Sequence, residues 1–112
     1  MHSGSCHCGK VAYEVDAEIE GPVLECNCSH CSRKGYLLWF VPQEKLKLKT
    51  PKEALSVYHF NKHVIDHHFC PDCGCAPFGK HDGKGMAAIN VRCLETVDLT
   101  KLERMAYDGR AS

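Results

Sequence analysis

The sequence predicts a small, mainly β single domain, and three features of the chain indicate it. The 112 residues are enough for one domain but not for two. Short apolar or alternating stretches of strand length recur along the chain, separated by glycine- and proline-containing turn signals. Helical periodicity is weak and leaves room only for short helical turns. We therefore expect residues 1–112 to form one domain built from many short strands.

In the first half of the chain, three stretches have the pattern of strands. Apolar and polar side chains alternate between residues 11 and 15, as in a half-buried strand, and Gly21-Pro22 then predicts a turn. Tyr36–Val41 is apolar throughout and is followed by Pro42, which predicts a buried strand. Leucines alternate with lysines across residues 45–49, which predicts a strand with one face in water.

In the second half, a hairpin and one further strand are expected. Ser56–Phe60 and His63–Phe69 flank Asn61-Lys62, which has the composition of a hairpin turn. Ala87–Val91 is a further apolar stretch of strand length. Short helical turns are expected at two places, Ser29–Lys34 and Thr100–Met105.

Charge and hydrophobicity exclude several classes of function. Basic and acidic residues balance at 14 each, and the sequence pI is about 7.1, which argues against broad binding to nucleic acid or to acidic lipid. No stretch approaches the roughly 20 apolar residues of a membrane helix. The first residues lack the charged and apolar regions of a signal peptide, so we expect a cytoplasmic protein.

The cysteine content indicates metal binding rather than disulfides. The chain has nine cysteines, an odd number that cannot pair completely. Most lie in tight Cys-x-Cys and Cys-x-x-Cys spacings, which suit ligands that converge on one ion. The cysteines form three clusters, at residues 6–8, 26–31 and 70–75, and Cys93 stands alone.

The spacings leave open which clusters share a metal. Cys70 and Cys73, followed by Gly74, form half of a tetrahedral site, and either other cluster can supply the remaining half. If the first and third clusters combine, they close a structural four-sulfur site, and the middle cluster keeps three thiolates and one exchangeable position, the form of a catalytic zinc site. Soft thiolates favour zinc, with an iron–sulfur cluster as the alternative. Cys75 and Cys93 complete no spaced set, so we expect them to be buried thiols.

Other side chains near the clusters are weaker candidates. Arg33 and Lys34 directly follow the middle cluster and could offset its negative charge or bind the carboxylates of an anionic thiol. His30 could serve as a ligand or as a hydrogen-bond partner of one. His67 and His68 lie on an expected strand and so point to opposite faces, where one of them could act as an acid or base.

Three motifs carry a family resemblance. They are GSCHCGKVAYEV at residues 4–15, CNCSHCSRKG at 26–35 and FCPDCGCAPF at 69–78. Weaker stretches, AINVRCLE at 88–95 and YDGR at 107–110, follow in the expected order. Together they resemble the family of glutathione-dependent formaldehyde-activating enzymes, which includes the centromere protein V domain.

The resemblance implies a fold, two zinc ions per chain and a reaction. The implied fold is a zinc-stapled β-tent. The implied structural zinc lies at Cys6, Cys8, Cys70 and Cys73, and the implied second zinc, with an open position, lies at Cys26, Cys28 and Cys31. The implied chemistry is that of a carbon–sulfur lyase, which joins formaldehyde and glutathione to S-(hydroxymethyl)glutathione or cleaves this adduct. The expected partner is therefore a small thiol such as glutathione.

The chain also departs from the family pattern and leaves alternatives open. His67-His68-Phe69 occupies a region where the family often has an arginine, and Cys75 stands where a threonine or serine often follows the Cys-Gly pair. The zinc motifs are intact. The alternative function is a non-catalytic, zinc-stabilised protein-binding module whose second site is completed by His30 or another residue, and a third is thiol or metal buffering. The fourth position of the second site discriminates between these functions, because it is exchangeable in an enzyme and filled by a protein ligand in a binding module.

Overall fold

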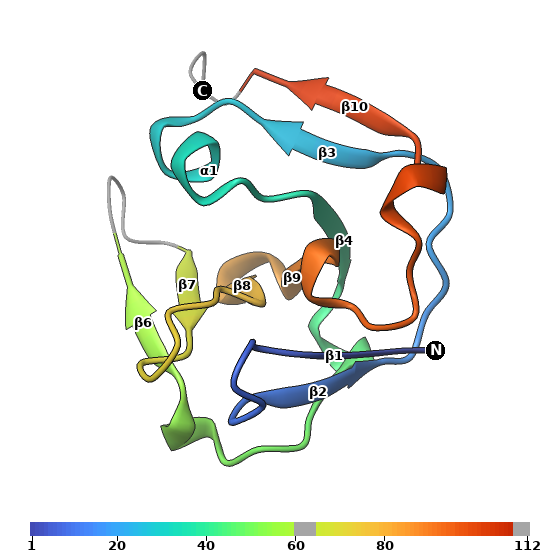
Figure 1. The fold of residues 1–112 in the computed structure, drawn as a ribbon. Coiled ribbons are helices and arrows are strands. Elements are labelled where there is room, and N and C mark those ends of the chain that lie inside the picture. The colour runs from blue at the N-terminus through green and yellow to red at the C-terminus, as the bar shows by residue number, and fades with distance from the viewer. Residues whose placement is uncertain (60–64, 109–112) are drawn as a thin grey trace.

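Two β-sheets and one short helix form the part of the chain that the computed structural model describes, residues 1–59 and 65–108 (Figure 1). The smaller sheet has the strand order β1-β2-β5, and the larger sheet has the order β10-β3-β4-β9-β8-β7-β6. The strands are β1 (His2–Ser5), β2 (Ala12–Val15), β3 (Val23–Cys26), β4 (Leu38–Pro42), β5 (Leu46–Leu48), β6 (Ser56–Tyr58), β7 (Asp66–Phe69), β8 (Phe78–His81), β9 (Met86–Asn90) and β10 (Arg104–Tyr107). The helix is α1 (Ser29–Lys34), and the 3-10 turns are η1 (Gln43–Lys45), η2 (Lys52–Ala54), η3 (Asp82–Lys84), η4 (Val91–Cys93) and η5 (Leu99–Lys101).

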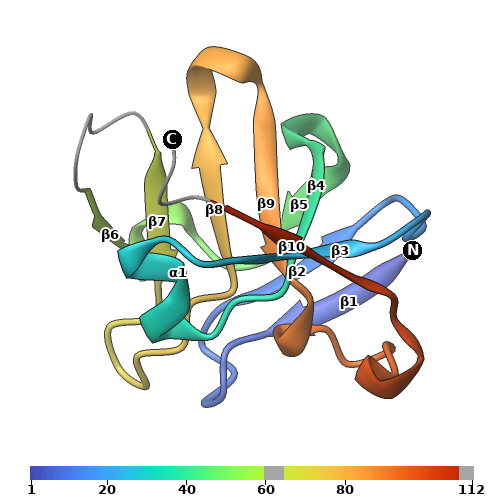
Figure 2. The same ribbon diagram turned by 90° about the horizontal axis from the view of Figure 1, so that it is seen from above.

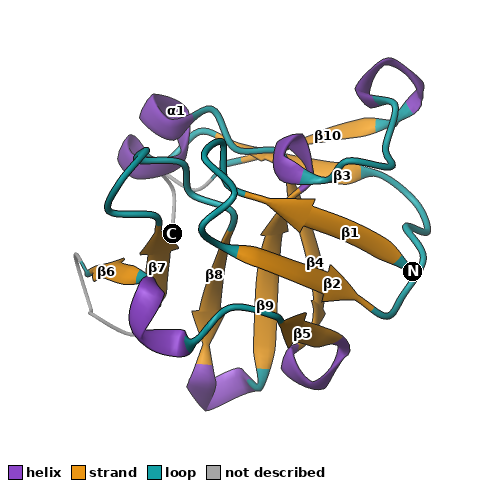
Figure 3. Ribbon diagram, turned by 60° about the horizontal axis from the view of Figure 1, so that its bottom comes forward, coloured by secondary structure: helices purple, strands orange, loops and turns teal. Residues whose placement is uncertain are grey.

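The core lies between the two sheets, because the small sheet packs across the inner face of the large one (Figure 3). Tyr13 of β2 is buried and meets the Phe78 ring of β8 edge-on, with 5.3 Å between ring centroids. Trp39 of β4 and Ile89 of β9 belong to the same buried cluster. Gly4 of β1 leaves room for the Tyr13 ring, since a Cβ at Gly4 would lie 2.6 Å from it.

Several expected elements are confirmed. Strand β2 covers most of residues 11–15, β5 occurs within residues 45–49, and helix α1 spans Ser29–Lys34 as predicted. Strands β6 and β7 pair antiparallel, as the predicted hairpin requires. The predicted turn at Asn61-Lys62 lies outside the described residues. The described part of the chain contains no helix long and apolar enough to cross a membrane.

Two expectations need correction. The stretch Tyr36–Val41 is not a wholly buried strand: the strand is Leu38–Pro42, and it alternates, with Phe40 47% exposed on its outer face. The helical turn expected at Thr100–Met105 is present only at the start of that stretch. The 3-10 turn η5 is capped by the Asp98 side chain and ends at Lys101, and the following residues extend into β10 beside β3. Backbone bonding to a neighbouring strand therefore outweighed a weak local helix signal.

The large sheet brings the candidate site together from distant segments. Strand β3 leads into α1, and α1 returns to β4, so this helix lies at the end of the sheet near β7 (Figures 1 and 2). Strand β10 pairs parallel with β3, and its Tyr107 stands opposite Cys26. Across the hairpin, Tyr58 of β6 stands opposite His67 of β7, so these two side chains share the outer face of the sheet.

Candidate metal centres and the pocket beside them

The first cysteine cluster joins two loops that are far apart in the chain. Cys6 and Cys8 lie in the loop after β1, and Cys70 and Cys73 lie in the loop after β7. Their four sulfurs all lie within 4.8 Å of one another. The structure therefore brings the first and third sequence clusters together, a choice that the spacings left open.

The geometry of this four-cysteine cluster fits zinc. The Cys8 sulfur lies 3.7 Å from the Cys6 sulfur and 3.7 Å from the Cys70 sulfur. Four sulfurs around a tetrahedral zinc, with bonds of about 2.3 Å, lie roughly 3.8 Å apart. Cys6 and Cys70 are buried, so two of the sulfurs face the protein interior. The donor set and its spacing thus match a closed structural site.

Backbone and charge interactions support the same cluster. The backbone N–H groups of Cys75 and Cys8 lower the pKa of the Cys73 thiol to about 6, which favours the thiolate that binds metal. Gly74 adopts a positive φ of 80°, and its N–H donates to the Cys70 carbonyl oxygen, which closes the tight turn. The Lys10 ammonium lies 3.0 Å from an Asp72 carboxylate oxygen and so ties the two loops together outside the cluster.

The second cluster is local and is built by the start of one helix. Cys26 ends β3, Cys28 is the N-cap of α1, and Cys31 lies within α1. The N–H of Cys31 donates to the Cys28 sulfur at 3.2 Å, and the N–H of Cys28 points to the Cys26 sulfur at 3.5 Å. The three sulfurs lie within 4.8 Å of one another. Capping of a six-residue helix therefore turns the thiol groups toward one point.

Within this three-cysteine cluster, the pKa values of two thiols are shifted in opposite directions. Partial burial opposes ionisation of Cys28, but the N–H of Cys31 and the neighbouring thiols outweigh it, so the pKa of Cys28 lies below its ordinary value. Burial raises the pKa of the Cys31 thiol above its ordinary value. Without a cation, three adjacent thiols resist ionising together, and a bound metal ion would reverse that preference.

A fourth protein ligand does not join the three sulfurs. In residues 1–59 and 65–108, no further His, Cys, Asp or Glu falls within the mutual 4.8 Å spacing of this group. His30 instead places its ring against three other rings. The centroid distances are 4.3 Å to His67, 5.5 Å to Tyr58, with the planes only 22° apart, and 5.6 Å to Tyr36. The fit to zinc is therefore that of a three-ligand site with an open position.

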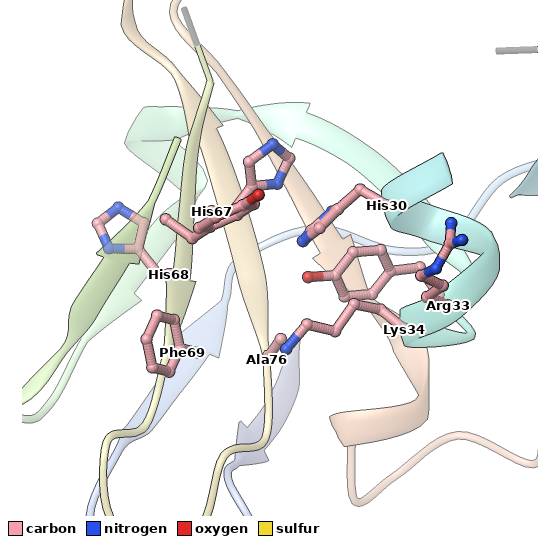
Figure 4. A pocket seen from close by; sticks show the side chains of 9 residues that line it. His30, Arg33, Lys34, His67, His68, Phe69 and Ala76 are labelled. Carbon is pink, nitrogen blue, oxygen red and sulfur yellow. The ribbon is translucent and has the colours of Figure 1, made fainter. Parts of the chain in front are cut away.

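A pocket of about 420 Å³ adjoins the three-cysteine cluster, between α1 and β7 (Figure 4). Tyr36 and Ala76 line the pocket and also pack against Cys31, and Phe69 of the pocket packs against the same group. The nine lining residues are His30, Arg33, Lys34, Tyr36, Tyr58, His67, His68, Phe69 and Ala76. The pocket thus shares walls with the three-cysteine cluster, and no lining residue comes from the four-cysteine cluster.

The lining of the pocket is aromatic and cationic. Arg33 and Lys34 are its charged members, and no acidic residue is among the nine. The Lys34 ammonium lies 5.7 Å from the centre of the Phe69 ring, a cation–π contact. Burial, together with the neighbouring His30 and His59, lowers the pKa of His67 to about 4, so its imidazole is neutral at physiological pH. The pocket suits a small anion with apolar parts.

The weaker sequence candidates have separate places. His67 faces His30 across the pocket, whereas His68 points to the other side of β7 (Figure 4), is 6% exposed and packs on Phe78. Cys75 and Cys93 are partly buried and belong to neither metal-capable group. Sequence reasoning missed Tyr36 and Tyr58 as pocket residues. Tyr58 could have been found from the predicted hairpin, which pairs it with His67. Tyr36 could not, because it lies in a stretch that we interpreted as a buried strand.

The chain is similar to known proteins in sequence and in fold. A family model described as glutathione-dependent formaldehyde-activating enzyme matches residues 1–107. A solved structure is also similar: the crystal structure of a Rhodobacter sphaeroides protein, determined as a structural genomics target. It has 28% sequence identity with this chain and a TM-score of 0.78, and the match covers 92% of this chain and 99% of that one.

Proposed function

Because this chain belongs to the glutathione-dependent formaldehyde-activating enzyme family, we propose that it acts as a zinc-dependent carbon–sulfur lyase. Its substrate would be the adduct of a small thiol with an aldehyde, of which S-(hydroxymethyl)glutathione is the family's type. The reaction forms or breaks one C–S bond. When the sulfur attacks, the C=O π electrons move to the oxygen, which takes a proton from water. In the reverse direction the hydroxyl proton leaves and the C–S electron pair returns to sulfur.

In this proposal the two clusters have different tasks. Cys6, Cys8, Cys70 and Cys73 hold a structural zinc, and Cys26, Cys28 and Cys31 hold the second zinc. When bound, the second zinc offers an open coordination position at which a thiol loses its proton near neutral pH. The chain's own contribution is to fix three sulfurs around that position through the N-cap geometry of α1.

The pocket residues would bind the rest of the thiol. Glutathione carries two carboxylates, and Arg33 and Lys34 are the cations beside the pocket. The same cations would also offset part of the negative charge of the three protein thiolates. His30, Tyr58 and Phe69 give apolar ring surface for the peptide part of the thiol.

One observation carries the proposal: a three-sulfur group without a fourth protein ligand among the described residues opens beside a cationic pocket. A purely structural zinc site has four protein ligands and needs no pocket. The arrangement supports an exchangeable position with a place for an anionic thiol next to it.

Native mass spectrometry of the zinc-loaded protein tests the proposal. We expect two zinc ions per chain and an added glutathione, and no addition of glutathione to the Cys28→Ser variant. S-methylglutathione, which cannot form a thiolate, should add much more weakly. Exchange NMR with ¹³C-formaldehyde and glutathione should then show faster formation of the adduct with enzyme than without it.

Two other outcomes would point elsewhere. Two zinc ions with no uptake of thiol would contradict the lyase proposal and support a zinc-stabilised protein-binding module. Uptake of glutathione with no acceleration of adduct exchange would support a thiol-binding or metal-buffering role.

A further inference from the structure

The Tyr36 side chain is held firmly beside the three-cysteine cluster. Tyr36 directly follows Gly35, the residue that ends α1 in a left-handed conformation with φ of 72°. Its own N–H donates to the Cys31 carbonyl oxygen at 3.4 Å. The residue is 7% exposed and packs in one cluster with Cys31 and Ala76. The helix that carries the cysteines therefore also fixes the position of this ring.

The hydroxyl of Tyr36 has a distinctive environment. Within residues 1–59 and 65–108, no group accepts a hydrogen bond from it. The hydroxyl is nevertheless not fully enclosed, because it is absent from the buried polar atoms that lack a partner. Tyr13 provides the contrast, because its hydroxyl is enclosed in the core without a partner in the described part of the chain. The Tyr36 hydroxyl therefore keeps access to the pocket that the residue lines. A donor fixed in this way and left unpaired is available to a ligand.

A tyrosine hydroxyl is a hydrogen-bond donor at physiological pH. A phenol ordinarily loses its proton only at about pH 10. The group therefore stays protonated throughout the physiological range and can offer its O–H to an oxygen that gains negative charge.

We propose that the Tyr36 hydroxyl donates a hydrogen bond to the aldehyde-derived oxygen of the substrate. This inference rests on the proposed lyase function. As the sulfur–carbon bond forms, the C=O π electrons become a lone pair on this oxygen, and the Tyr36 O–H stabilises the developing alkoxide until water protonates it. In the cleavage direction the same bond orients the hydroxyl of the adduct while its proton leaves to water. Tyr36 keeps its own proton in both directions.

Other polar groups of the pocket suit this task less well. Tyr58 is 50% exposed, and its ring stacks on His30. Lys34 places its ammonium over the Phe69 ring. His68 lies on the opposite face of β7 and packs against Phe78. Tyr36 combines a fixed ring, contact with the cysteine cluster and an available donor.

The test compares Tyr36→Phe with Tyr58→Phe, which removes the other tyrosine hydroxyl of the same pocket. The first readout is binding, by calorimetry, of S-(2-hydroxyethyl)glutathione and S-ethylglutathione to the zinc-loaded proteins. The hydroxyl of the first ligand should add affinity in the wild type and in Tyr58→Phe. In Tyr36→Phe this advantage should shrink by about 3–10-fold, the usual net value of one hydrogen bond, while S-ethylglutathione binds unchanged.

The second readout is the rate of formaldehyde–glutathione exchange at saturating thiol. Loss of one donor to a developing oxyanion typically lowers turnover by about 100-fold or more, so Tyr36→Phe should fall far below Tyr58→Phe. Zinc content and thermal unfolding should match the wild type in both variants, because the ring and its packing are kept.

The outcomes distinguish failure of the Tyr36 role from failure of the lyase function. Wild-type turnover with an unaffected Tyr36→Phe variant would overturn the role of Tyr36 and leave the lyase function standing. Equal losses in both tyrosine variants would also overturn it, since a specific donor predicts a difference. A wild type that binds no thiol and accelerates no exchange would remove the lyase function and this inference with it.

Discussion

The two cysteine clusters differ most in how much chain they close. In the four-cysteine cluster, Cys8 and Cys70 are 62 positions apart, whereas in the three-cysteine cluster Cys28 and Cys31 are 3 apart. Holding the ends of a long segment together removes much more conformational freedom from the unfolded chain than holding a single helical turn. We therefore expect an ion at the first cluster to stabilise the fold, and an ion at the second to have little effect on it.

The same difference explains which cluster can serve chemistry. A structural zinc site takes all four ligands from the protein and so resists loss of metal, and the four sulfurs of this cluster would provide those ligands. The local cluster can leave one position open, because the sheet and core hold the chain without it. The proposed function would thus assign stability and reactivity to separate metal sites in one small domain.

Cys73→Ser should give the largest effect on this comparison. It removes one ligand of the staple, so we expect loss of one zinc and at least about 4 kcal/mol of stability, seen as a fall in Tm of about 15 °C or more. Cys75→Ser is the matched control, since Cys75 belongs to neither metal-capable group. Calorimetry with zinc analysis measures both quantities. A Cys73→Ser protein that keeps two zinc ions and wild-type stability would contradict the structural role of the four-cysteine cluster.

Cys28→Ser should separate metal binding from folding. Serine is a preferred N-cap, so the variant loses a thiolate and keeps the cap of α1. We expect one zinc per chain, no glutathione uptake and a Tm within about 5 °C of the wild type. If Cys28→Ser and Cys73→Ser unfold alike, both clusters are structural.

Neutralising the cations beside the pocket should have a moderate effect. In the double variant Arg33→Gln, Lys34→Gln, glutathione affinity should fall about tenfold or more, because charge-assisted bonds to its carboxylates are lost. Binding of 2-mercaptoethanol, which has no carboxylate, should weaken much less, because it loses only the general offset of negative charge. Lys101→Gln, on the exposed turn η5, is the control. An equal loss for both thiols would assign these side chains to the metal site instead of to the substrate.

A change at His67 should have the smallest effect, on the dependence of stability on pH. The pKa of His67 in the folded protein is about 4, below its unfolded value near 6.5, so only the unfolded chain binds this proton between the two pH values. Stability of the wild type should fall as pH drops from about 6.5 to 4, and His67→Gln should show a shallower fall. Urea unfolding across this range measures it, with Tyr58→Phe as the control that alters the same pocket. Parallel curves would remove His67 from the acid response.

Local geometry accounts for what the sequence predicted of the site. A capped turn of helix predicts that Cys28 and Cys31 meet, and strand alternation predicts that His67 and His68 diverge. Both depend on residues a few positions apart. The family resemblance supplied what spacing did not, namely that the loop of Cys6 meets the loop of Cys70.

Long-range pairing explains what the sequence did not predict. The parallel neighbour of β3 is β10, and a segment that follows a turn and lies far along the chain has no local signal for such a partner. The exposure of Phe40 depends on which face of the large sheet the small sheet covers. Tyr36 enters the pocket because α1 ends at Gly35 and turns the chain toward Cys31.

The pairing of β10 with β3 has a consequence for how the protein is made. Cys26, Cys28 and Cys31 leave the ribosome together, so they can take up a metal ion early. The backbone N–H of Asn27, between the first two, donates to the carbonyl oxygen of Tyr107, which is synthesised 80 positions later. At about 5–20 residues per second, several seconds separate these events. During that interval the nascent chain presents its thiols before the strand that supports them exists, and a newly made molecule is most open to oxidation then.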